Sequence, residues 1–192
     1  ELVEQAAALG HAGFGLCDTN GLAGVVRAHG AAKAAGLPFA PGCRLRLEDG
    51  AEWLAWPADR AAYGRLTALL SAGRMAAPKG ECRLDFAMLC DAAEGMALAA
   101  IPPVAPAALR RLGGLRLALP PLIAVACPLL GDDAAELARH AALAEACGAR
   151  LLATNNVRYH VPSRRRLADV LSAIRLRCTV DALGQAAEPN AE

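Results

Sequence analysis

Apolar and polar positions alternate with two different periods along the chain. Apolar residues at helical spacing, often ended by a glycine, predict helices, and shorter apolar runs predict buried strands. The predicted helices cover residues 1–9, 22–35, 57–71, 84–91, 104–112, 132–147 and 163–175. The predicted strands cover residues 13–17, 41–47, 52–56, 96–101, 115–119 and 150–154. Repeated alternation of strand and helix indicates an α/β fold with a mostly parallel sheet or barrel.

Composition supports one folded domain. The chain has 192 residues, of which 55% are hydrophobic and 4% are aromatic. This content excludes a disordered chain and predicts a core built from Ala, Leu and Val. The formal net charge of +1 argues neither for nor against a polyanionic partner.

The cysteines indicate the redox state of the compartment in which the protein is expected. There are seven, widely spaced and without a Cys-x-x-Cys pair, so neither a disulfide framework nor a zinc cage is predicted. We therefore expect a reducing, cytoplasmic location. The apolar stretch 115–130 is interrupted by prolines and is too short to span a bilayer, so no membrane association is expected. The first residue is not Met, and we expect a piece of a longer polypeptide.

Two polar loops follow predicted strands, where sites of parallel α/β folds lie. Residues 18–20 read Asp-Thr-Asn. A carboxylate there is compatible with a bound cation, but the spacing favours an Asx-type turn in which Asp18 or Asn20 caps the next helix. Residues 155–160 offer amides and an arginine where a metal would need carboxylate and imidazole. The four histidines are scattered, and His160 is predicted to face solvent or to cap a helix.

A basic cluster lies near the end of the chain. It comprises Arg158, Arg164, Arg165, Arg166, Arg175 and Arg177, against the single acid Asp169. Such a cluster suits DNA phosphates, an acidic neighbouring domain, or merely a solvated helix face. Neither a Walker loop, a Gly-x-Ser-x-Gly motif nor the aspartate triad of a polymerase palm is present.

The two polar loops carry a family resemblance. Residues 17–24 read Cys-Asp-Thr-Asn-Gly-Leu-Ala-Gly, and residues 153–159 read Ala-Thr-Asn-Asn-Val-Arg-Tyr. They resemble the PHP domain of bacterial family C DNA polymerases, and the stretches 41–45, 63–66, 79–82 and 169–175 resemble its error-prone branch. The resemblance implies a distorted (β/α) barrel of the PHP type whose first strand is missing from this chain. It also implies a PHP domain at 1–184 and an exit linker toward the polymerase palm at 185–192.

The departures from the family pattern affect the metal site. Active PHP domains hold metals with His and carboxylate ligands. At the corresponding positions this chain has Thr19 for His, Arg44 for Glu, Asn156 for Asp and Arg158 for His. An arginine stays protonated and is no ligand. With Asp18, these residues are interpreted as vestigial metal-site positions, and we expect Arg44 and Arg158 to pair with Asp18.

The resemblance implies a structural and interaction domain of an error-prone DNA polymerase, a nucleotidyltransferase of lesion-bypass DNA synthesis and DNA repair. No catalytic residue, metal or cofactor is expected in this segment, and Mg²⁺ is expected for the parent polymerase. The expected partners are the palm and thumb of the same polymerase, DNA through the parent protein, and lesion-bypass accessory proteins. The alternatives are a metal-dependent phosphoesterase or 3′–5′ exonuclease, and a metal-free binding module unrelated to polymerases.

Overall fold

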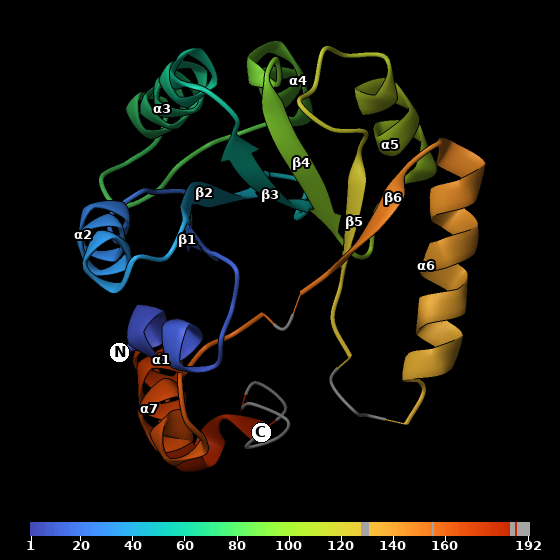
Figure 1. The fold of residues 1–192 in the computed structure, drawn as a ribbon. Helices are drawn as coiled ribbons and strands as arrows, with labels where there is room; N and C mark the ends of the chain where they lie inside the picture. Colours follow the sequence, from blue (N-terminus) through green and yellow to red (C-terminus); the bar gives the residue numbers. More distant parts are fainter. Residues whose placement is uncertain (128–130, 155, 185–186, 188–192) are drawn as a thin grey trace.

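The computed structural model describes residues 1–127, 131–154, 156–184 and 187. These residues form one six-stranded sheet in which the strands lie in the order of the sequence (Figure 1). Strand β3 runs antiparallel to both neighbours, and the other three pairings are parallel. The strands are β1 (Phe14–Thr19), β2 (Phe39–Arg46), β3 (Glu52–Pro57), β4 (Met96–Ile101), β5 (Leu122–Val125) and β6 (Arg150–Ala153). Strands β1 and β6 are the two edges of this sheet.

Helices surround the sheet. They are α1 (Leu2–Ala8), α2 (Val25–Ala35), α3 (Arg60–Met75), α4 (Phe86–Ala92), α5 (Pro106–Gly113), α6 (Asp133–Cys147) and α7 (Arg165–Leu176). Two 3₁₀ turns, η1 (Pro162–Arg164) and η2 (Val180–Ala182), flank α7. Helices α2 to α6 follow one another around the sheet, whereas α7 lies below it (Figure 1). None of the helices in the described ranges is long and apolar enough to cross a membrane.

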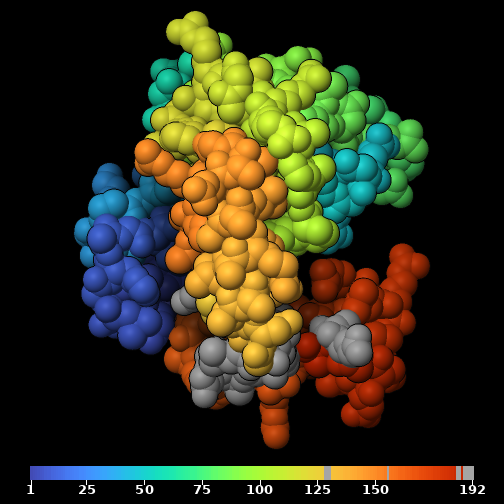
Figure 2. Space-filling view, turned by 90° about the vertical axis from the view of Figure 1, so that its right-hand side faces the viewer, coloured from blue at the N-terminus to red at the C-terminus, as the bar shows by residue number. Residues whose placement is uncertain are grey.

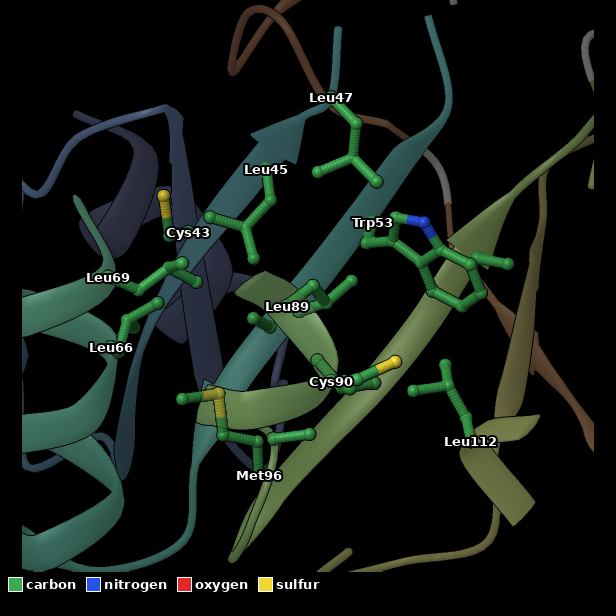
Figure 3. Packing of buried hydrophobic residues seen from close by; sticks show 14 of the residues in the cluster. Cys43, Leu45, Leu47, Trp53, Leu66, Leu69, Leu89, Cys90, Met96 and Leu112 are labelled. Carbon is green, nitrogen blue, oxygen red and sulfur yellow. The ribbon is translucent and has the colours of Figure 1, made fainter. Parts of the chain in front are cut away.

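The main core lies between one face of the sheet and helices α3 to α6. Alternate residues of β2, β3 and β4 point into it, as expected for period-two strands. Figure 3 shows Cys43, Leu45, Trp53 and Met96 directed toward this layer. The opposite face of the sheet carries a smaller cluster around Ala99, Leu122 and Ala124. The packed core is therefore on one side of the sheet, and Arg44, Arg46 and Glu52 are on the other.

Most predicted elements are confirmed, with three corrections. The strand predicted at 115–119 is wrong: Leu115 and Leu117 pack on the core from a loop, and the strand between β4 and β6 is Leu122–Val125. Pro57 was predicted in the first turn of a helix but ends β3, and Asp59 caps α3 by accepting a hydrogen bond from the Ala62 N–H at 2.7 Å. The last helix was predicted to begin at Ser163, but Ser163 belongs to η1 and α7 begins at Arg165.

Candidate functional site

The carboxyl ends of β1 and β2 bring three of the predicted positions together. The strands are parallel, with Asp18 opposite Cys43 and Thr19 opposite Arg44. Because parallel strands end at the same edge of a sheet, Asp18, Thr19 and Arg44 lie in one row along that edge. Thr19 and Arg44 are on one face of the sheet, and Asp18 is on the face of Cys43. We call this row and its direct neighbours the strand-end site.

Asp18 has a structural role in this row. Its Oδ2 accepts a hydrogen bond from the Gly24 N–H at 2.6 Å, at the start of α2. A Cβ on residue 24 would lie 2.7 Å from Leu16 Cδ2 and 3.0 Å from Asp18 Oδ2, so a larger residue there would require both side chains to move. The carboxylate thus ties the end of β1 to the beginning of the next helix, as the turn interpretation of the sequence predicted.

Asn20 extends the pairing of β1 and β2 beyond the last strand residue. Its N–H donates to the Arg44 carbonyl at 2.8 Å, and its Oδ1 accepts from the Arg46 N–H at 2.9 Å. Arg74 of α3 donates from Nη2 to the Asn20 carbonyl at 2.9 Å. The turn after β1 is therefore held by hydrogen bonds from β2 and α3. No local pattern indicated Arg74, which is 54 residues away.

Arg44 pairs with Glu52, not with Asp18 as predicted. Its Nε donates to Glu52 Oε2 at 2.9 Å and its Nη2 also contacts that oxygen, while Arg46 Nε donates to Oε1 at 2.7 Å. The antiparallel register places Arg46 opposite Glu52 and Arg44 two residues along on the same face, so both guanidinium groups reach one carboxylate. We call Arg44, Glu52 and Arg46 the β2–β3 ion network.

The environment of Glu52 favours its charged form. Its side chain is 13% exposed, and this burial acts to raise the pKa of the carboxyl. The hydrogen bonds from Arg44 and Arg46 outweigh burial and hold that pKa below its ordinary value. The network therefore contains one ionised carboxylate and two permanent positive charges.

An indole and a thiol fill the surface next to the network. A Cβ on residue 42 would lie 2.6 Å from Trp56 Cδ1 and 2.7 Å from Cys17 Sγ, so Gly42 accommodates both side chains. Burial, with smaller effects from Cys43 and Asp18, raises the pKa of Cys17 to about 12. The Cys17 thiol is thus neutral at physiological pH.

The second predicted loop begins at the other edge of the sheet. Asn156 has a left-handed backbone (φ 47°), and its N–H donates to Thr154 Oγ1 at 3.3 Å. Arg158 lies beside α7, where it lines a cavity of about 230 Å³ with Leu171, Ser172 and Arg175. Arg158 has an interaction within the chain, and its predicted pairing with Asp18 stays a prediction.

The basic cluster is partly neutralised. Arg164 Nη2 lies 2.8 Å from Glu1 Oε1, and Arg165 Nε lies 3.7 Å from Asp169 Oδ2. His160 is not solvent-facing: its side chain is 17% exposed and its Nδ1 lies 3.8 Å from Glu1 Oε2. These contacts attach the start of α7 to the first residue of the chain.

No family model matches the sequence. Error-prone DNA polymerases, however, match it along its full length. That of Brucella abortus is 44% identical over 202 residues, and that of Caulobacter vibrioides is 41% identical over 199. The chain is homologous to a segment of the error-prone DNA polymerases. It spans 19% of the Brucella polymerase and 18% of the Caulobacter polymerase.

Two solved structures share the fold of this chain. An amidohydrolase from Chromobacterium violaceum superposes with a TM-score of 0.59 and 16% identity, covering 85% of this chain and 82% of its own. A structure named as a metal-dependent phosphoesterase, from Bifidobacterium adolescentis, has a TM-score of 0.57 and 15% identity, covering 83% and 81%. At this identity the likeness shows a PHP-like α/β fold, not an activity.

The donors at the strand-end site do not fit the metal cluster that the PHP fold implies. The Asp18 carboxylate accepts a hydrogen bond from the Gly24 N–H, and Thr19 offers only a hydroxyl group. The Arg44 guanidinium is hydrogen-bonded to Glu52. In the described parts of the chain, no three His, Cys, Asp or Glu side chains gather closely enough to hold a metal ion. Hydrogen bonds and ion pairs join the elements at this edge of the sheet.

Proposed function

We propose that this segment is the PHP-type domain of an error-prone DNA polymerase, and that it has exchanged its metal site for a protein-only scaffold. In this proposal residues 1–184 form the domain and residues 185–192 form an exit linker toward the palm. The linker prediction falls on residues that, except for residue 187, lie outside the described chain. The sheet is a distorted barrel without its first strand, an interpretation supported by the position of β1 at an open edge.

The β2–β3 ion network is the observation that carries the proposal. Two guanidinium groups converge on one carboxylate at the end of β2, so the local charge is positive. Two unit charges about 4 Å apart interact by about 4 kcal/mol at an effective dielectric constant of about 20, and a divalent ion doubles this energy. A divalent cation would therefore be repelled by the two arginines together more strongly than Glu52 alone could offset.

The segment serves the polymerase as a structural and interaction domain and supplies none of its reacting groups. Nucleotidyl transfer with Mg²⁺ takes place in the remaining polypeptide, which acts in lesion-bypass synthesis and DNA repair in the bacterial cytoplasm. The partners of the segment are the palm and thumb of the same chain and, through the whole polymerase, DNA and lesion-bypass accessory proteins. The vestigial positions Asp18, Thr19, Arg44, Asn156 and Arg158 contribute stability instead of chemistry.

Two assays test this function. The full-length polymerase that contains this segment is expected to extend a primed template with Mg²⁺. The 192-residue chain alone is expected neither to extend the primer nor to shorten a labelled single-stranded oligonucleotide in Mn²⁺ or Zn²⁺. Metal-dependent shortening by the chain alone, abolished by a chelator, would contradict the proposal and support a phosphoesterase or exonuclease.

A further inference from the structure

Helix α7 exposes its large apolar residues and buries its small ones. Leu167, Val170, Leu171 and Ile174 are 41–68% exposed, whereas Ser172 and Ala173 are 8% and 4% exposed. The four aliphatic residues follow the spacing i, i+3, i+4, i+7, so they form one continuous stripe, here called the α7 stripe. A helix on the surface of an isolated domain normally shows the reverse arrangement, and a contiguous apolar stripe marks an interaction surface.

The described chain leaves most of the α7 stripe exposed, although Leu171 also lines the cavity beside Arg158. The elements that pack most closely on α7 are η1 and η2 at its own two ends. Its beginning is attached to the rest of the domain by the ion pair between Arg164 and Glu1. In Figure 2 the C-terminal segment, in red, forms a lobe at the lower right of the molecule. The helix is thus anchored at its ends, with its apolar side available to a partner.

Arginines define the chemistry of that partner. On a helical projection of α7, Arg166 lies on one side of the stripe and Arg175 on the other, and both residues are exposed. A surface complementary to this face has an apolar groove with acidic residues on both rims. A DNA backbone would satisfy the arginines but would leave four aliphatic side chains in water.

Relatives of the chain extend well beyond the matched segment. The matched segment accounts for only 19% of the Brucella polymerase, so about four fifths of that polypeptide lie outside it. A surface elsewhere in the same polypeptide is tethered to α7, so its effective concentration near the helix is high. Docking through a single helix is therefore sufficient.

We propose that the α7 stripe docks into an acidic-rimmed apolar groove in the remainder of the polymerase polypeptide. This inference rests on the proposed function, because it requires the segment to be part of that polypeptide. Docking fixes the orientation of the PHP-type domain relative to the rest of the enzyme. It also explains why α7 combines small residues on its inner side with large residues on its outer side.

Cysteine accessibility tests the docking surface directly. Leu171→Cys and Ile174→Cys are introduced separately into the 192-residue chain and into the full-length polymerase, and thiol alkylation is followed at each site by peptide mass spectrometry. Because a buried thiol reacts slowly, we expect at least about tenfold slower alkylation at both sites in the polymerase. The control is Val26→Cys, at an 80% exposed residue of α2, which should react at the same rate in both proteins. Equal rates at residues 171 and 174 in the two proteins would overturn the proposal.

Primer extension by the same full-length preparations separates this inference from the proposed function. Normal extension together with unprotected α7 cysteines would overturn the docking surface alone.

A second copy of the chain is the competing occupant. Light scattering is expected to show a monomer for the 192-residue chain, and a dimer that Leu171→Glu dissociates would overturn docking within the polypeptide.

Discussion

Glu52 is a single carboxylate between two arginines, and sequence reasoning did not select it. The prediction from the family pattern identified Arg44 as a non-ligand, and this chemistry follows from residue type alone. Its partner depends on the register of β2 and β3, which places Arg46 opposite Glu52. Such a register is a property of the folded sheet and of the hairpin turn, so local sequence could not distinguish Glu52 from Asp18 as the acceptor.

Replacing Glu52 tests the β2–β3 ion network. Glu52→Gln retains the shape of the side chain but loses the charge-assisted hydrogen bonds, and we expect it to lower the free energy of unfolding by about 1–2 kcal/mol near neutral pH. Urea denaturation measures this difference. Glu48→Gln is the control, because Glu48 is exposed and lies 3.8 Å from Arg83, and its loss should change stability by less than about 0.5 kcal/mol.

The effect of Glu52→Gln depends on pH with a definite sign. The folded-state pKa of Glu52 lies below the unfolded value of about 4.3, so its contribution is fully present above that value. The contribution is lost as the pH falls through the lower, folded-state pKa. Unfolding curves of both proteins should therefore converge in acid, and a difference that stays constant over the whole acid range would count against the network.

The close packing around Gly42 can be tested by substitution, with a second glycine of the same chain as the control. A methyl group at residue 42 would collide with Trp56 and Cys17, so Gly42→Ala should destabilise the fold by about 1–3 kcal/mol. Gly30 lies inside α2, and a Cβ added there would meet nothing within 4 Å, so Gly30→Ala should stabilise the fold by about 0.5–1 kcal/mol. Thermal unfolding measures both, and equal effects of the two substitutions would refute the close packing at residue 42.

Helix boundaries followed from the sequence wherever a local signal determines them. Gly36 and Gly148 end α2 and α6 in left-handed conformation, as predicted from their positions after the last helical apolar residue.

The wrong strand prediction at 115–119 has a different origin. Leu115 and Leu117 show the alternation of a strand, but the place beside β4 is occupied by 122–125, whose residues pair with β6 as well. Long-range pairing decided between two apolar runs that local pattern could not separate.

The cap of α3 gives a prediction at the scale of one element. Asp59→Ala removes the acceptor for the Ala62 N–H, and we expect a loss of about 1 kcal/mol in the free energy of unfolding. Asp132 occupies the same position before α6 but makes no side-chain cap hydrogen bond, so Asp132→Ala should cost less than about 0.5 kcal/mol. Chemical denaturation measures the free energy of unfolding of both variants. Equal losses in the two variants would contradict the assigned cap.

The whole molecule is a domain whose fold resembles hydrolases and whose sequence resembles polymerases. A likeness of fold says nothing about which strand-end residues bind metal, whereas the side chains at the strand ends do. The sequence sufficed to predict the α/β class, because alternating strands and helices require it. It did not suffice to predict the outward apolar face of α7, because the exposure of Leu171 and Ile174 depends on how the helix is placed on the domain.

Metal content is the most direct measure of the central claim. The purified 192-residue chain is incubated with Zn²⁺, Mn²⁺ and Fe²⁺ in turn, freed of unbound ions by gel filtration and analysed by elemental mass spectrometry. Because arginines and hydrogen-bonded donors occupy the strand-end site, well below one ion per chain should remain bound. Retention of a stoichiometric cluster of two or three ions would contradict the account.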